Sequence, residues 1–195
     1  MRDAEMVVTA GANAMGLIFA DSPRAVSREM AVHLARLTND QLTRVAVFRD
    51  RRDEEILAIV DQVDVEAVQL HDAMSGELET ELRARGQSII KALAITGDDF
   101  INFDERRVDA VLIDGTRAGS GKTHTWDRLA HRDFSVPIVA AGGLTPANVA
   151  SVIETIRPWG VDSASGVELR SGEKDMERVS NFVANARRAF DETRE

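Results

Sequence analysis

The sequence predicts an α/β fold, a parallel β/α barrel that lacks its first strand. Short apolar runs alternate with amphipathic helical stretches along the whole chain, which is the pattern of repeated βα units around a parallel sheet. Several runs, such as AVLI and PIVAA, are apolar at consecutive positions, as expected for strands that are covered on both faces. Because 195 residues with 44% hydrophobic residues suit one core, we expect residues 1–195 to form a single barrel domain.

Strands are predicted where apolar runs are bounded by polar or turn-forming residues. Seven such runs follow one another, at Ala14 to Phe19, Thr43 to Phe48, Glu66 to Leu70, Ser88 to Leu93, Ala110 to Ile113, Ile138 to Ala141 and Gly160 to Ser163. A closed (β/α)8 or TIM barrel needs eight strands, whereas an open doubly wound sheet accepts seven. The count alone leaves both architectures open.

Helices are predicted from caps and from apolar residues at helical spacing. The clearest start is Thr145-Pro146, where an N-cap hydroxyl precedes a proline at the first helical position. Further helices are expected near Ser27, Asp53 and Ser75, and from about Asp175 to Phe190. A helical stretch from Asp3 to Ala10 comes before the first strand, so the chain opens on a helix where a βα repeat should open on a strand.

Charge and composition exclude several classes of partner. The formal net charge of -9 would repel nucleic acid and anionic membrane surfaces, so neither is an expected partner. No apolar run has the length of a signal-peptide core or a membrane span, and a cytoplasmic location is the default. The chain contains no cysteine, which excludes disulfides, thiolate metal sites and a thiol nucleophile among these residues.

Two glycine-containing turns follow the last two predicted strands. Gly142 and Gly143 lead directly into a helix start, and Ser165 and Gly166 form a second turn of small residues. Such turns let the backbone approach an anion closely, and the loops after strands seven and eight commonly hold a phosphate in β/α barrels. We therefore predict a phosphate site here, with ordinary tight turns as the alternative.

Polar residues at other strand ends are further candidates. Asp114 leaves an apolar strand and could serve as a general acid or base, or cap a turn. Arg24 follows the first visible strand and suits a substrate carboxylate or phosphate. His71 closes the strand VQLH and could bind substrate, although a packed histidine is the more common case. No cluster has metal-ligand spacing, so we predict no metal.

At these residues the chain resembles the phosphoribosylanthranilate isomerase family of tryptophan biosynthesis. Eight blocks follow the family's order and spacing: GANAMGLIFADSPRAVS, VAVF, VQLHD, IIKAL, AVLIDG with GSGKT, AAGGLTPANV, RPWGVDSASGVE and GEKD. The resemblance implies a TIM barrel of the ribulose-phosphate-binding type and a phosphorylated sugar as substrate. It implies no cofactor, and it leaves open whether the protein is a monomer or a homodimer.

The implied reaction is an Amadori rearrangement of N-(5'-phosphoribosyl)anthranilate to 1-(2-carboxyphenylamino)-1-deoxyribulose 5-phosphate. By motif, Asp114 takes the place of the general acid and Arg24 that of the arginine facing the anthranilate carboxylate. The four turn residues fall on the phosphate-holding turns, and Asp162 matches another residue near the substrate. His71 is carried along as a substrate-binding candidate. Ala164 departs from the family by replacing a serine, which removes a hydroxyl but leaves the backbone N–H.

The general base does not carry over. In the family it is a cysteine on a first strand of the form Lys-(Ile/Val)-Cys-Gly-x-Thr, which this sequence lacks. The expectation is therefore an N-terminally truncated isomerase with weak or absent catalysis, since losing one member of an acid–base pair costs about 10² to 10⁴ in rate. The alternatives are a non-catalytic sugar-phosphate-binding barrel and another ribulose-phosphate-binding isomerase.

Overall fold

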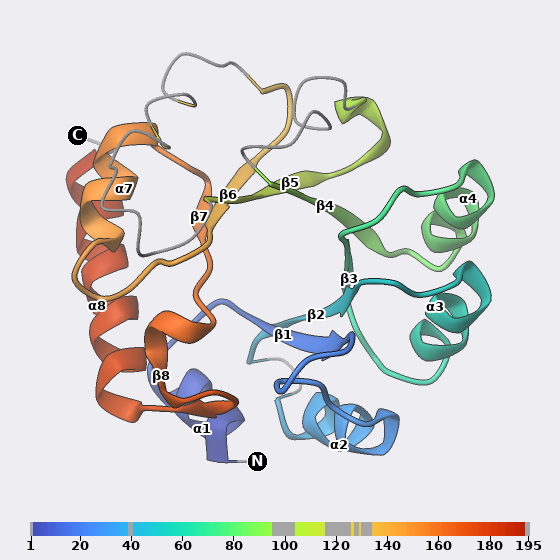
Figure 1. The fold of residues 1–195 in the computed structure, drawn as a ribbon, viewed down its shortest axis with the longest axis horizontal. Helices are drawn as coiled ribbons and strands as arrows, with labels where there is room; N and C mark the ends of the chain where they lie inside the picture. Colours follow the sequence, from blue (N-terminus) through green and yellow to red (C-terminus); the bar gives the residue numbers. More distant parts are fainter. Residues whose placement is uncertain are drawn as a thin grey trace. The chain divides into compact units, whose positions relative to one another are not determined.

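The structure, a computed structural model, describes residues 2–38, 41–94, 104–115, 126, 129 and 134–193. They fall into two compact units: unit 1 comprises Met1–Ala92 with Arg107–Asp109, and unit 2 comprises Leu93–Arg106 with Ala110–Glu195. Figure 1 shows the strands with their connecting helices in chain order. We describe each unit by itself.

Unit 1 is a run of βα repeats opened by a helix. Its elements are α1 (Arg2–Thr9), β1 (Ala14–Phe19), α2 (Arg28–Leu37), β2 (Thr43–Phe48), α3 (Asp53–Val60), β3 (Ala67–Leu70), α4 (Gly76–Ala84) and β4 (Ser88–Ala94), whose last two residues belong to unit 2. The strands pair in the order β1-β2-β3-β4, and every pair is parallel. Among the described residues, α1 precedes the first strand, as the sequence predicts.

Helices α2 and α4 begin where the sequence places their caps, whereas α3 has Arg52 as its N-cap and Asp53 as its first residue. The Ser27 hydroxyl accepts the Met30 N–H at 3.2 Å, and the Ser75 hydroxyl accepts the Leu78 N–H at 2.9 Å, which satisfies N–H groups that have no partner within the helix. On the sheet, Phe19 and Phe48 stack with ring centroids 5.4 Å apart. The buried faces of helices and strands thus meet in one apolar core.

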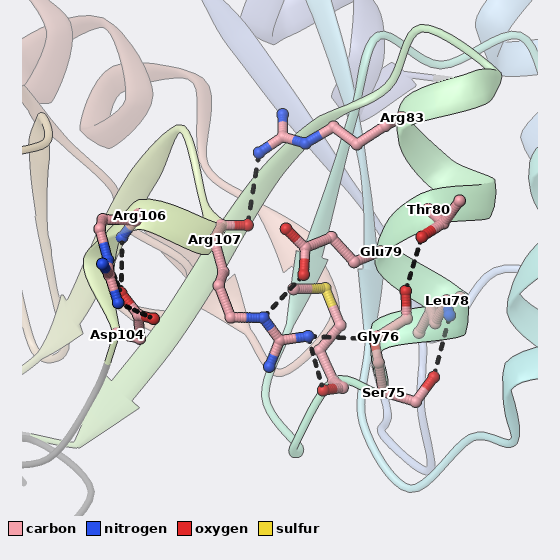
Figure 2. A network of polar contacts seen from close by, with 10 residues as sticks. Ser75, Gly76, Leu78, Glu79, Thr80, Arg83, Asp104, Arg106 and Arg107 are labelled. Atoms are coloured by element: carbon pink, nitrogen blue, oxygen red, sulfur yellow. Dashed lines mark hydrogen bonds and ion pairs between the residues drawn. The ribbon is translucent and has the colours of Figure 1, made fainter.

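The segment 107–109 is tied to unit 1 by polar contacts (Figure 2). Arg107 Nε donates to Glu79 at 2.7 Å, and its Nη2 donates to the carbonyls of Met74 and Ser75 at 3.3 and 3.2 Å. Asp109 then exchanges hydrogen bonds with Ile89, its N–H donating to the Ile89 carbonyl at 2.8 Å and its carboxylate accepting the Ile89 N–H at 2.6 Å. The turn before α4 is therefore held by a residue far along the chain.

Unit 2 contains three parallel strands and a short hairpin. Its elements are β5 (Ala110–Asp114), β6 (Ile138–Ala141), α7 (Val149–Ile156), β7 (Gly160–Val161), the 3-10 turn η2 (Ser165–Val167), β8 (Glu168–Arg170), β9 (Glu173–Lys174) and α8 (Met176–Thr193), with η1 (Glu105–Arg107) at the unit boundary. The order is β5-β6-β7, and β8 pairs antiparallel with β9. Helices α7 and α8 pack together.

Several boundaries differ from the sequence prediction. Strand β3 begins at Ala67, β4 ends at Ala94 and β5 ends at Asp114, each one residue from its predicted bound. Helix α7 begins at Val149 rather than after Thr145. The reason is that the side-chain amide of Asn148 binds the preceding backbone: it accepts the Thr145 N–H at 2.7 Å and donates to the Gly143 carbonyl at 3.1 Å. Strand β7 ends at Val161 instead of Ser163, and α8 continues to Thr193. Hairpin β8-β9 was not predicted.

The seven predicted parallel strands are all present among the described residues. That residues 1–195 form one domain stays a prediction. In the described part of the chain, no helix is both long and apolar enough to cross a membrane.

Candidate active site

Asp114 lies at the end of β5, against the first glycine turn of unit 2. It is the last paired residue of the strand, opposite Ala141 of β6. A Cβ at Gly142 would overlap an oxygen of the Asp114 carboxylate and the backbone of Gly115, and Gly142 has a φ of 85°. Both the steric contact and the left-handed backbone require glycine. The predicted acid therefore contacts the predicted phosphate turn directly.

The two glycine turns are joined through one carbonyl group. The Ser163 hydroxyl donates to the Leu144 carbonyl at 2.7 Å. A Cβ at Gly166 would overlap the same carbonyl, so glycine is needed here for close approach. Because Leu144 is 1% exposed, its carbonyl group has little freedom to move, and both turns contact it. The structure thus brings together the turn residues Gly142, Gly143, Ser165 and Gly166 in unit 2.

Asp162 follows β7 on the same side of unit 2. Its N–H continues the strand ladder by donating to the Ala140 carbonyl at 2.8 Å. The pKa of its carboxyl group is raised, chiefly because surrounding protein displaces water, with the Asp114 charge adding to the rise and Lys174 opposing it. The residue nevertheless keeps an exposed surface, so a ligand can reach it.

Arg24 lies in unit 1 on the loop after β1. The loop is held by the Val26 N–H, which donates to the Ile18 carbonyl at 3.0 Å, and by the Arg24 N–H, which donates to the Ser22 hydroxyl at 3.2 Å. The backbone that carries the guanidinium is therefore fixed, and the residue is half-buried.

His71 follows β3 in unit 1 and is held in its neutral form. Its Nδ1 lies 2.9 Å from Nη2 of Arg49, and its Nε2 lies 3.2 Å from the Gln69 side-chain amide. Because arginine can only donate, Nδ1 must accept, so Nε2 carries the proton of the neutral ring. Burial, with Arg49 and Lys91 nearby, lowers the pKa of His71 from 6.5 to about 4. At neutral pH this ring is a hydrogen-bond donor without charge.

Sequence reasoning gave no role to Lys174, which the structure places beside the second turn. Its Nζ donates to the Ala164 carbonyl at 2.8 Å and lies 3.3 Å from Glu168. The GEKD block had marked this residue without indicating what it touches. The GSGKT block lies outside the described residues, and nearby Trp126 packs its indole against Gly115.

No group of three or more potential metal ligands occurs among the residues that the structure describes. In unit 2 the predicted site residues offer hydrogen-bonding groups and a backbone that a ligand can approach closely. In unit 1 they offer the guanidinium of Arg24 on a fixed loop and the neutral imidazole of His71. Such groups can bind anions and transfer protons.

Comparison with known proteins identifies the family. The family model for N-(5'phosphoribosyl)anthranilate (PRA) isomerase matches residues 1–185. The isomerase of Haloarcula marismortui is 39% identical over 96% of this chain and 92% of its own length. That of Halobacterium salinarum is 40% identical over 98% of this chain and 94% of its own.

Solved structures agree in fold. The phosphoribosylanthranilate isomerase of Thermotoga maritima is similar with a TM-score of 0.84 and 34% identity, over 95% of this chain and 93% of that one. A second isomerase structure, in complex with reduced 1-(o-carboxyphenylamino)-1-deoxyribulose 5-phosphate, has a TM-score of 0.80 and 31% identity, over 95% of this chain and 93% of that one.

These matches leave two expectations without support. Alignments that cover 92% and 94% of the two relatives give no support to an N-terminally truncated chain, nor to the expectation of weak or absent catalysis. The match to the family model, the relatives and the TIM-barrel-like neighbours agree, and this chain belongs to the N-(5'-phosphoribosyl)anthranilate isomerase family, the isomerases of tryptophan biosynthesis.

Proposed function

We propose that this chain catalyses the Amadori rearrangement of N-(5'-phosphoribosyl)anthranilate to 1-(2-carboxyphenylamino)-1-deoxyribulose 5-phosphate. The observation that carries the proposal is the contact of the Asp114 carboxylate with the Gly142 turn. It provides a proton donor next to a backbone suited to hold a phosphate. A relative of known structure binds a reduced form of the product, which supports the same substrate class.

Each predicted residue has a proposed task. Asp114 protonates the ribose ring oxygen, which opens the ring to a Schiff base. Arg24 binds the anthranilate carboxylate, for which a guanidinium fork is well suited. His71 contributes a neutral imidazole next to the substrate, and Asp162 accepts a hydrogen bond from a sugar hydroxyl. Ser165 and the three turn glycines, Gly142, Gly143 and Gly166, hold the phosphate through backbone N–H groups.

The general base stays unassigned among these residues. The family resemblance implies a cysteine, and the 195 residues contain none. A direct comparison addresses this point: the chain as it stands is assayed beside a version extended at its N-terminus by a strand of the form Lys-x-Cys-Gly-x-Thr. We expect the chain as it stands to form product, and the comparison of the two rates measures what a cysteine at that place adds.

Product formation is followed by chromatography of substrate and product. Asp114→Asn in the same assay should lower the rate while the reduced product analogue still binds. If neither version forms product although the analogue binds, the non-catalytic sugar-phosphate-binding barrel is the better description. Turnover of a different aminoaldose phosphate, with no reaction of the anthranilate compound, would instead favour another isomerase of this barrel type.

The quaternary structure and location are also proposals. One relative of known structure, from Thermotoga maritima, is a dimeric isomerase from which monomers were generated, so both a monomer and a homodimer are consistent with the family. Light scattering of the purified protein distinguishes the two masses. A cytoplasmic location follows from the proposed biosynthetic role.

A further inference from the structure

The hairpin β8-β9 carries a block of the family resemblance that the proposed function leaves without a task. This block, GEKD, spans residues 172–175. Its lysine, Lys174, lies opposite Glu168 in the antiparallel pairing. Although the two strands are short, they place an ammonium group next to the second glycine turn.

Lys174 acts on the backbone of that turn. Its Nζ donates to the Ala164 carbonyl at 2.8 Å. The peptide between Ala164 and Ser165 is planar and trans, so its C=O and N–H point in opposite directions. Fixing the carbonyl toward Lys174 therefore fixes the Ser165 N–H in the opposite direction, away from Lys174. The side chain at position 164 has no part in this, which explains how alanine can replace the family's serine.

The ammonium group is itself held in place. It lies 3.3 Å from Glu168, whose side chain is 4% exposed, while the Lys174 side chain is 21% exposed. A nearly buried carboxylate needs such a partner. Arg178 of α8 donates to the Glu168 backbone carbonyl at 2.5 Å, and the Asp175 N–H donates to the Val167 carbonyl at 2.9 Å. The hairpin is thus anchored to α8 and to η2.

The lysine does not need to touch the ligand to act. An ammonium group has three N–H donors, and contacts with Ala164 and Glu168 use two of them. Its charge also reaches Asp162, where it opposes the rise in pKa caused by burial. The turn, the carboxylate and the lysine form one electrostatic unit.

We propose that Lys174 is a positioning residue that orients the Ser165 N–H toward the 5'-phosphate of the substrate. This inference rests on the proposed function, because it assumes that the turn 164–166 binds a sugar phosphate.

The test measures affinity for two probes by calorimetry. One is reduced 1-(o-carboxyphenylamino)-1-deoxyribulose 5-phosphate, and the other is the same compound without its phosphate. Lys174→Met alone would remove the ammonium group that pairs with the nearly buried Glu168 carboxylate, so the double variant K174M/E168Q is used, with E168Q alone beside it. Arg170→Met is the matched control, because Arg170 is an exposed cation on the same hairpin that pairs with Glu173. Lys174→Arg tests rescue by a conserved charge.

In K174M/E168Q we expect affinity for the phosphorylated probe to fall about tenfold or more, the equivalent of one lost charge-assisted hydrogen bond. Affinity for the probe without phosphate should stay unchanged. R170M should match the wild type, E168Q should lose less affinity for the phosphorylated probe than K174M/E168Q, and K174R should recover part of the loss. A merely structural role would weaken both probes equally, and that result overturns the proposal, as does unchanged binding in K174M/E168Q. If the wild type binds neither probe, the proposed function itself fails.

Discussion

Gly166→Ala is the substitution whose effect the structure predicts most directly. The new Cβ would overlap the carbonyl group of Leu144. A side chain could rotate away from such a contact, but this neighbour is backbone, and its residue is 1% exposed. Relief requires the two glycine turns to separate, which also breaks the 2.7 Å hydrogen bond from the Ser163 hydroxyl to the same carbonyl.

The magnitude follows from these two contributions. Overpacking costs about 1–3 kcal/mol and the lost hydrogen bond about 1 kcal/mol, so the free energy of unfolding should fall by about 2–4 kcal/mol. For a chain of this size that lowers Tm by about 4–16 °C. Because the same movement displaces the proposed phosphate turn, the KM for substrate should rise about tenfold or more, while kcat changes little.

Gly160→Ala is the matched control. The same methyl group is added in the same unit, on β7, where the nearest atom to the new Cβ is Val139 Cγ2 at an ordinary 3.7 Å. This variant should keep its Tm and KM. The measurements are thermal unfolding by circular dichroism and steady-state kinetics. If Gly166→Ala unfolds at the same temperature as Gly160→Ala and has an unchanged KM, the described junction between the turns is wrong.

Four further predictions follow. Asp114→Asn should lower kcat about 10² to 10⁴-fold and leave binding of the reduced product analogue within about threefold of wild type by calorimetry; an unchanged kcat would remove Asp114 as the acid. The folded-state pKa of His71 is lowered from 6.5 to about 4, so its contribution to stability is complete above pH 6.5 and is lost as the pH falls toward 4. The full shift corresponds to about 3 kcal/mol, which partial exposure reduces to about 1–2 kcal/mol. The unfolding free energy, measured by urea titration at several pH values in this range, should fall more steeply with decreasing pH in the wild type than in His71→Asn. An equal pH dependence in the two proteins would contradict the assignment. Glu66→Ala should lower the unfolding free energy by about 1–3 kcal/mol without changing kcat, because Glu66 accepts from the N–H and Nε of buried Arg44 at 2.7 and 3.2 Å; Asp64→Ala, which removes an exposed partner of the same arginine, should cost less than about 1 kcal/mol. If residues 1–195 are one domain, fluorescence and circular dichroism should report a single urea transition, and two separated transitions would show independent units.

The strands could be predicted because each is an apolar run with clear ends. Strand β1 occupies Ala14–Phe19 and β6 occupies Ile138–Ala141, the bounds that the sequence indicates. Strand β7 is shorter than predicted because Ser163 turns to bond the Leu144 carbonyl. That contact joins residues 19 positions apart, and no local pattern encodes it.

The hairpin β8-β9 shows why charged residues mislead sequence reasoning. The segment from Glu168 to Lys174 reads as a polar surface loop. In the structure, however, Glu168 is 5% exposed, because Lys174 from the other strand of the hairpin pairs with it. Only the folded hairpin brings Lys174 next to Glu168, and the hydropathy of the sequence does not show this pairing. The burial of Glu168 could therefore not be predicted.

The position of His71 at the end of β3 could be predicted from the sequence, but its protonation state could not. A histidine at a strand end can be an acid, a base or a donor. The choice depends on Arg49, which follows the neighbouring strand β2 and whose guanidinium can only donate to Nδ1. The unit 1 group is thereby limited to hydrogen bonding near neutral pH. In the proposed mechanism Asp114 transfers the proton, and its carboxylate contacts the Gly142 turn, so a change at Gly142 should alter both binding and catalysis.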